Sequence, residues 1–338
     1  MLLDVNNMSL SLKRAGKYSR ILDQVSFQVN KGETVGIVGE SGCGKSMTAL
    51  SVMRLLPEKA RLEGEVQLDG EKITSFSKRK MERIRGNQMS MIFQDPLTSL
   101  NPLHTVGAQI EESLILHTKM GKKERRQRVL ELLRDVGLPR AEELIDEYPH
   151  QLSGGMRQRI MIAIAMACEP QLLICDEPTT ALDVTIQAQI LELMNKLKQD
   201  TQMGIIMITH DMGVVAEVCD RVVVMYAGKV VEQAPVVELF QNPKHPYTQG
   251  LLQSIPKLGQ RKHKLGSIPG TVPAPEKMPT GCRFVDRCKH AMDICRDSLP
   301  EMTQINGDHH TACWLYDEEE GFKDGTIGSN QSETVLHK

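Results

Sequence analysis

The residues best suited to chemistry form one glycine-rich loop, Gly39-Glu40-Ser41-Gly42-Cys43-Gly44-Lys45-Ser46. Glycine, four residues and then glycine-lysine-serine is the pattern of a phosphate-binding loop. The glycines let backbone N–H groups point at phosphate oxygens, and the N-terminus of a following helix adds a partial positive charge. We expect Lys45 to reach the β- and γ-phosphates and the Ser46 hydroxyl to bind Mg²⁺. The loop therefore predicts a nucleoside triphosphate site.

The segments on either side of this loop have the composition that the site needs. Residues 34–38 are short, apolar and rich in β-branched side chains, which predicts a buried strand. Residues 47–56 are mostly helix formers and contain no proline. Strand, loop and helix thus follow one another in the order that phosphate binding requires.

A second chemical feature is the acidic pair Asp176-Glu177, which follows the apolar run 172–175. At the end of a strand beside a phosphate loop, Asp176 can bind Mg²⁺ directly or through water. Glu177 then lies one residue further out and can polarise an attacking water. The alternative is that the pair only caps a helix that begins near Thr179. Beside a phosphate loop we favour the catalytic interpretation.

Three further features are weak signals when each is taken alone. Ser153-Gly154-Gly155 begins an apolar helix, whose N-terminus could bind a γ-phosphate or could simply be capped by the serine. His210 ends the apolar run 205–209, and Gln94 ends the apolar run 89–93. A polar residue after a strand is most often an ordinary loop residue.

Taken together and in order, these motifs resemble the nucleotide-binding subunit of an ATP-binding cassette (ABC) transporter over about residues 1–255. The matching residues are Gln94, Ser153-Gly154-Gly155-Met156, Asp176-Glu177, Asp183 and His210. The resemblance implies that residues 153–156 act on ATP held by a partner subunit. ATP is then sandwiched head to tail between two subunits, with Mg²⁺, and hydrolysis requires a dimer.

The resemblance also implies roles for single residues. His210 would contact the γ-phosphate and hold the transition-state geometry. Gln94 would sense the γ-phosphate and Mg²⁺, and its loop would couple to membrane subunits. Asp183 would lie in the loop that crosses between the two ATPase subunits. The family stacks an aromatic ring on adenine upstream of the phosphate loop, and Tyr18 is the nearest candidate.

Two stretches near the C-terminus narrow the resemblance to importers of dipeptides, oligopeptides or nickel. They are His245-Pro246-Tyr247-Thr248 and the cysteine tail formed by Cys282, Cys288, Cys295 and Cys313. In this family the cysteine tail implies a [4Fe–4S] cluster. Zn²⁺, with His309 or His310 available as a further ligand, and four reduced thiols remain open as alternatives.

The order of the elements predicts an α/β fold with a P-loop NTPase core, in which helices cover a doubly wound, mostly parallel sheet. Alternating polarity at residues 25–29, with a partner strand at 7–12, predicts an N-terminal antiparallel β layer. We expect an ATPase domain at 1–255 with a helical subdomain at about 95–165, a small cysteine-rich region at 256–318 and a disordered tail at 319–338.

Composition limits the partners and the location. The 338 residues are 40% hydrophobic and 25% charged with a net charge of −2, which gives no reason to expect a nucleic-acid partner. No apolar run is long enough to cross a bilayer, and the N-terminus lacks a signal-peptide pattern. These features predict a chain in the cytoplasm, and the resemblance to an importer subunit implies that it lies peripherally at the cytoplasmic face of the membrane.

The resemblance supplies the expected partners: a second, related ATPase subunit, two membrane permease subunits and an extracellular solute-binding protein. The predicted activity is ATP hydrolysis that powers peptide import, with nickel import as the alternative. A soluble cassette ATPase acting on DNA or ribosomes is disfavoured, because residues 45–153 hold one ordinary helical region instead of a coiled coil and the chain has one cassette.

Overall fold

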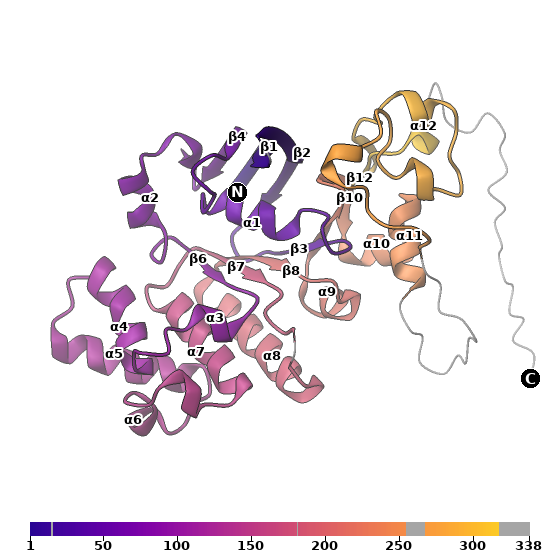
Figure 1. Cartoon of the computed structure of the whole chain (residues 1–338). Helices are drawn as coiled ribbons and strands as arrows, with labels where there is room; N and C mark the ends of the chain where they lie inside the picture. Colours follow the sequence, from indigo (N-terminus) through magenta and orange to yellow (C-terminus); the bar gives the residue numbers. More distant parts are fainter. Residues whose placement is uncertain (15, 181, 255–267, 318–338) are drawn as a thin grey trace, which may run out of the picture.

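The computed structural model describes residues 1–14, 16–180, 182–254 and 268–317, which form two sheets and a set of covering helices (Figure 1). The predicted tail at 319–338 lies outside the described residues. In the larger sheet the strand order is β11 (Thr303–Asn306), β12 (His309–Thr311), β10 (Lys229–Pro235), β9 (Arg221–Tyr226), β3 (Thr34–Val38), β8 (Gly204–Ile208), β7 (Leu172–Asp176) and β6 (Met89–Ile92).

The centre of the larger sheet is parallel. Strand β3 pairs in parallel with both β8 and β9, and β7 pairs in parallel with β8 and β6. Every residue of β3, β7 and β8 is buried, as expected for strands covered on both faces. The predicted P-loop core with a mostly parallel sheet is confirmed, and the phosphate loop leaves its middle strand.

The smaller sheet is the predicted antiparallel layer. Its strand order is β2 (Lys17–Val29), β1 (Leu3–Arg14), β4 (Arg61–Leu68) and β5 (Glu71–Lys72). Met8 pairs with Val25 across β1 and β2, so the alternating stretch has the expected partner. The apolar face of this sheet and the first helix, α1 (Lys45–Val52), share one core with Ile37 of β3. The antiparallel layer therefore supports the helix that follows the phosphate loop.

A helical region lies between β6 and β7 and projects from the sheet (Figure 1). It comprises α3 (Pro96–Ser99), α4 (Val106–His117), α5 (Lys122–Asp135), α6 (Ala141–Leu144), the 3₁₀ turn η2 (Pro149–Gln151) and α7 (Gly154–Met166). The basic run 122–128 belongs to α5, where Arg125 pairs with Glu111 and Arg128 pairs with Glu169, both over 2.8 Å. The run is thus a charged helix face that forms ion pairs with neighbouring residues.

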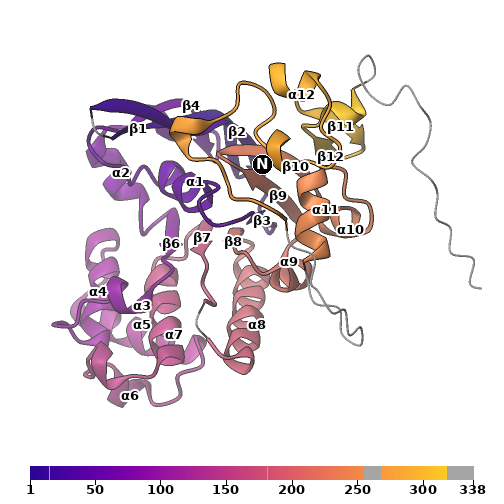
Figure 2. The ribbon, with the colours of Figure 1, turned by 45° about the vertical axis from the view of Figure 1, so that its right-hand side comes forward.

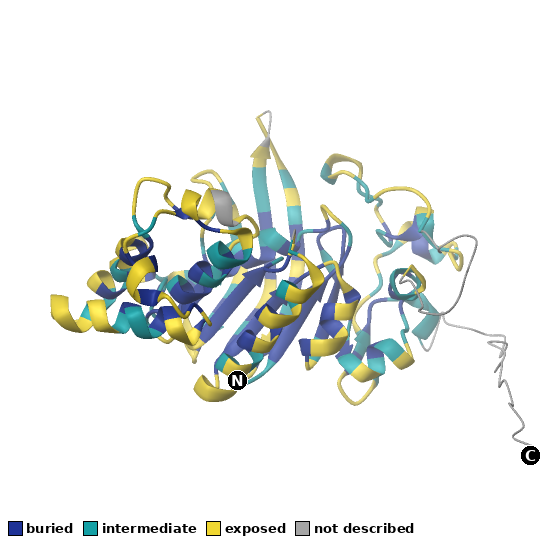
Figure 3. Cartoon of the chain, turned by 90° about the horizontal axis from the view of Figure 1, so that it is seen from below, coloured by how far each residue is buried: buried dark blue, intermediate teal, exposed yellow. Residues whose placement is uncertain are grey.

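The remaining helices cover the sheets. They are α2 (Lys78–Ile84), α8 (Val184–Thr201), α9 (Met212–Val218), α10 (Val236–Gln241), α11 (Pro246–Gln253) and α12 (Ile294–Asp297), with 3₁₀ turns η1 (Ile73–Ser75), η3 (Pro275–Lys277), η4 (Val285–Arg287) and η5 (Trp314–Tyr316). Figure 3 shows the central strands of the larger sheet buried and the helices exposed on their outer faces. Among the described helices, none combines the length and apolar composition needed to cross a bilayer.

The cysteine-rich region joins the larger sheet. Strand β12 pairs antiparallel with β10, where Glu232 lies opposite Thr311, and β11 pairs with β12. Hydrogen bonds between β10 and β12 therefore connect the segments on either side of residue 255 in one sheet. The division into domains at that residue stays a prediction.

Candidate functional site

The phosphate loop has the backbone geometry that its glycines predict. Gly44 is the N-cap of α1 and has φ = 108°, a value that side chains disfavour. A Cβ at Gly39 would lie 2.2 Å from the carbonyl oxygen of Met225, so only glycine fits there. The Lys45 ammonium is buried and donates to the carbonyl of Gly39 over 2.7 Å. The loop thus holds the Lys45 ammonium at the start of α1.

The acidic strand end lies beside this loop. Strand β7 ends at Asp176, whose Oδ1 accepts a hydrogen bond from the Ser46 hydroxyl over 3.0 Å. Burial raises the pKa of Asp176, although the bond from Ser46 and the charge of Lys45 act in the opposite direction. A buried carboxylate touching a hydroxyl is a donor set that suits a hard cation such as Mg²⁺.

Glu177, which follows β7, is contacted by residues that follow the two neighbouring strands, β6 and β8. Its Oε2 accepts hydrogen bonds from Gln94 and from Thr180, each over 3.0 Å, and its Oε1 lies 3.3 Å from Nδ1 of His210. Glu177 has φ = 50°, an uncommon value for a residue with a side chain. The backbone N–H of Glu177 donates to the carbonyl of Ile208 over 2.9 Å, which helps to fix this conformation.

Lys45, Ser46, Gln94 and Glu177 line one cavity of about 490 Å³, a size typical of sites for small molecules. The cavity is lined by Ile21, Ser41, Gly42, Gly44, Lys45, Ser46, Met47, Gln94, Glu177, Val272, Pro273, Ala274 and Pro275. His210 lines a neighbouring cavity with Gly39 and Glu40. The phosphate loop, Gln94 and Glu177 therefore line one cavity, while the catalytic role of Glu177 stays a prediction. The sequence places residues 272–275 in the cysteine-rich region at 256–318 and does not predict their contribution to this cavity.

Other predicted site residues lie elsewhere. Ser153 is the N-cap of α7 and Asp183 is the N-cap of α8, so each also has a structural role. Neither is among the described residues that line the cavity. Tyr18 on β2 is not among them either, and the guanidinium of Arg61 lies 3.8 Å from the centre of its ring. Whether Tyr18 stacks on a base stays a prediction.

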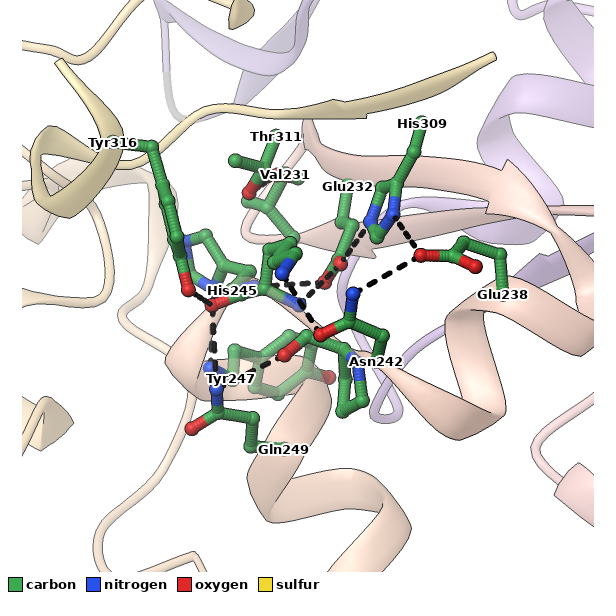
Figure 4. Close-up of polar contacts among 12 residues, drawn as sticks. Val231, Glu232, Glu238, Asn242, His245, Tyr247, Gln249, His309, Thr311 and Tyr316 are labelled. Carbon is green, nitrogen blue, oxygen red and sulfur yellow. Dashed lines mark hydrogen bonds and ion pairs between the residues drawn. The ribbon is translucent and has the colours of Figure 1, made fainter. Parts of the chain in front are cut away.

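The His245-Pro246-Tyr247-Thr248 motif connects the C-terminal region to the phosphate loop. His245 is buried and caps α11, and its Nδ1 accepts from the N–H of Tyr247. The hydroxyl of Tyr247 accepts from the N–H of Glu40 over 2.7 Å. Glu232, fully buried, accepts from the N–H of His245 and lies 2.8 Å from His309 Nε2 (Figure 4). Buried polar groups with such partners fix one arrangement of the chain.

The four C-terminal cysteines lie near one another. Burial, with the influence of neighbouring thiols, raises the pKa of Cys282 to about 11 and that of Cys313 to about 12. Cys313 interacts electrostatically with all three other thiols, and the N–H of Cys282 donates to the carbonyl of Cys295 over 2.8 Å. In the described part of the chain, however, no three cysteine, histidine or acidic side chains are arranged as a metal site. The predicted cluster has thiol donors gathered in one place but no ligating geometry.

Comparisons with known proteins agree with this site. Residues 22–180 match the family model described as ABC transporter, and residues 231–295 match the oligopeptide/dipeptide transporter C-terminal region. The oligopeptide transport ATP-binding protein AppD of Bacillus subtilis is 53% identical over 94% of this chain and 98% of its own length. A probable peptide ABC transporter ATP-binding protein, y4tR of Sinorhizobium fredii, is 49% identical over 94% of this chain and 96% of its own length.

A solved structure also resembles the chain. It is the dimeric post-hydrolysis state of the ATP-binding cassette MJ0796 bound to ADP and Pi, with a TM-score of 0.63 and 30% identity. The match covers 70% of this chain and 99% of that structure.

Proposed function

The chain belongs to the ABC transporter family of ATPases, and from this premise we propose that it hydrolyses ATP to power an importer of dipeptides or oligopeptides. The observation that supports this best is the convergence of Gln94, Thr180 and His210 on Glu177, at the cavity that the phosphate loop lines. The match of residues 231–295 to the oligopeptide/dipeptide transporter model supports the substrate class. Nickel import is the second candidate, and action on DNA or ribosomes is disfavoured.

Each group at the cavity has a distinct role in hydrolysis. Loop N–H groups and Lys45 hold the triphosphate, while Ser46 and Asp176, 3.0 Å apart, would hold Mg²⁺, which supplies charge neutralisation at the phosphates. Glu177 orients the attacking water and accepts its proton. Gln94 and His210 hold Glu177 from two sides and are placed to respond to the γ-phosphate.

A second ATPase subunit completes each site. Residues 153–156 begin α7 away from the cavity of their own chain, so they are available to the ATP of a partner. The dimeric cassette of the solved relative supports this arrangement. We infer that the partner is a related chain, that Asp183 lies in the crossing loop, and that two permease subunits and an extracellular solute-binding protein complete the transporter. The chain would then act at the cytoplasmic face of the membrane.

The gathered thiols of Cys282, Cys288, Cys295 and Cys313 are proposed to hold a [4Fe–4S] cluster, with Zn²⁺ as the alternative. Neighbouring thiols contribute to the raised pKa values of Cys282, Cys288 and Cys313, and this supports the proposal because the ligands of one group must lie near one another. The raised pKa values mean that protons must leave when a metal binds, and the bound metal keeps the thiolates ionised. The role of the bound cluster would be structural.

ATPase assays of the chain, alone and assembled, test this function. We expect low activity from the isolated chain and a rise when the second ATPase and the permeases are added, since each site needs a partner's residues 153–156. Lys45→Ala in the assembled complex is the control for contaminating ATPases. Full activity from a monomer would contradict the composite site.

A further inference from the structure

A segment of the C-terminal region lies at the cavity of the phosphate loop. Val272, Pro273, Ala274 and Pro275 line that cavity together with Ser41, Lys45 and Glu177. Figure 2 shows the orange ribbon of this part of the chain passing α1 toward β2. The nucleotide site is therefore built from both ends of the described chain.

The lining residues fall into two chemical groups. Lys45, Ser46, Gln94 and Glu177 carry charges, hydroxyl or amide groups, whereas Ile21 and residues 272–275 have apolar side chains without donors or charges. A nucleotide is divided in a similar way, into a charged triphosphate and an uncharged nucleoside whose base has apolar faces. Because the phosphate loop would hold the triphosphate beside Lys45 and Ser46, Ile21 and residues 272–275 are the lining residues that suit the faces of the base.

Arg287 ties this segment to the phosphate loop. Its guanidinium donates to both carboxylate oxygens of Glu40, over 2.7 and 2.9 Å, and to the carbonyls of Ile268 and Pro269 over 3.2 and 2.7 Å. The side chain is only 6% exposed, and a shielded two-pronged ion pair of this kind is geometrically specific. One side chain thus holds a loop residue and the two residues that lead into the lining segment.

The other end of the segment is held by β2. Turn η3 contacts β2, and Glu276 accepts a hydrogen bond from the Ser19 hydroxyl over 3.4 Å. Ile21, on the same strand, lines the cavity beside the segment. The segment is fixed before and after the four residues that face the nucleotide pocket.

We propose that residues 272–275 form the nucleoside-side wall of the ATP site and that Arg287 is the positioning residue that sets this wall against the phosphate loop. The proposal rests on the ATPase function above and adds a part of the binding site to it. The C-terminal region then takes part directly in nucleotide affinity.

Equilibrium binding to the full chain with Mg²⁺ tests the wall, with ATP and inorganic tripolyphosphate as the two probes. Val272→Asn places an uncharged polar group on the wall, and we expect ATP affinity to fall by about tenfold while tripolyphosphate affinity stays within about twofold. Val237→Asn, on α10 and 62% exposed, is the matched control and should leave both affinities unchanged. Where Val272→Asn does not fold, Val272→Ala gives the same comparison with an expected loss of about threefold.

Arg287→Lys tests the positioning role, since lysine keeps the charge but loses the two-pronged contact. We expect the ratio of ATP to tripolyphosphate affinity to fall by about threefold to tenfold; a merely structural role would lower the melting temperature and leave this ratio unchanged. If folded Val272→Asn binds ATP with unchanged affinity, or loses affinity equally for both probes, the inference about the wall is overturned. The proposed ATPase function is not affected by that result. A wild-type chain that binds no ATP overturns the proposed function as well.

Discussion

The carboxamide of Gln94 donates a hydrogen bond to the carboxylate of Glu177 over 3.0 Å, and so links the residues that follow strands β6 and β7. The same carboxylate lies 3.3 Å from His210, which follows β8. Three adjacent parallel strands thus deliver their side chains to one acid. The triphosphate, in contrast, is proposed to bind to the loop that follows β3. On this proposal, ATP hydrolysis and triphosphate binding depend on separate residues, so mutations can separate the two.

Glu177→Gln should abolish turnover while ATP stays bound. The amide keeps the shape of the side chain but cannot accept the proton of the attacking water, so we expect the rate to fall by about 100-fold to 10,000-fold. ATP affinity should change by less than about threefold, because the phosphate loop and Lys45 are intact. Single-turnover hydrolysis and ATP binding by the assembled transporter measure the two effects.

Glu192→Gln is the matched control for this change, since Glu192 lies exposed on α8. It should leave both turnover and ATP affinity at wild-type values. Turnover by Glu177→Gln within a few-fold of wild type would remove Glu177 from the role of base.

Ser46→Ala should raise the Mg²⁺ concentration needed for half-maximal ATPase activity. The hydroxyl touches Asp176 over 3.0 Å and is the neutral oxygen of the proposed cation site. Loss of one oxygen ligand should cost about tenfold in apparent Mg²⁺ affinity. Titration of the activity with Mg²⁺ at saturating ATP gives this value. Ser75→Ala, at an exposed serine, should titrate like wild type, and the same result for Ser46→Ala would refute the assignment.

The phosphate site is predictable from sequence because its geometry is local. Gly44 has a positive φ and begins α1 directly, so the spacing of glycine, Lys45 and Ser46 already describes the structure. The buried strands before it and before Asp176 are likewise visible as apolar runs.

The C-terminal wall of the site could not be predicted in this way. The contact between Arg287 and Glu40 joins residues 247 apart, and nothing in the composition near either residue indicates the other. Residues 272–275 have no periodicity, because they line a cavity as an irregular segment between two fixed points. Prolines in such a stretch are typical of a linker, although here Pro273 and Pro275 line the cavity of the phosphate loop.

His245→Asn should reduce the loss of stability in acid. Burial lowers the pKa of His245 from 6.5 to about 4, although Glu232 acts in the opposite direction. Between these two pH values only the unfolded chain takes up the proton. Stability present above about pH 6.5 is therefore lost as the pH falls toward 4, by up to about 3 kcal/mol. Asparagine can still cap α11 but does not titrate.

Urea unfolding at pH 7 and pH 5 measures the effect, compared between His245→Asn and wild type. We expect the variant to be less stable at pH 7, because it loses the ring that packs on Phe284, but to lose less stability on acidification. His104→Asn, at an exposed histidine, is the control and should follow wild type. An equal acid loss in His245→Asn and wild type would contradict the assignment.

The cysteine tail should yield iron and sulfide when the protein is purified without oxygen. Neighbouring thiols contribute to the raised pKa values of Cys282, Cys288 and Cys313, and this segment, which has few buried apolar side chains, would gain stability from a bound group. We expect a brown protein whose iron and acid-labile sulfide both fall in Cys313→Ser. Cys168→Ser, at a half-buried thiol in the helical region, should keep the wild-type content. Zinc, or no metal at all, in the anaerobic wild-type protein would refute the cluster. Because α11 and β12 connect this region to the phosphate loop through Tyr247 and Glu232, loss of the bound group should also lower the melting temperature.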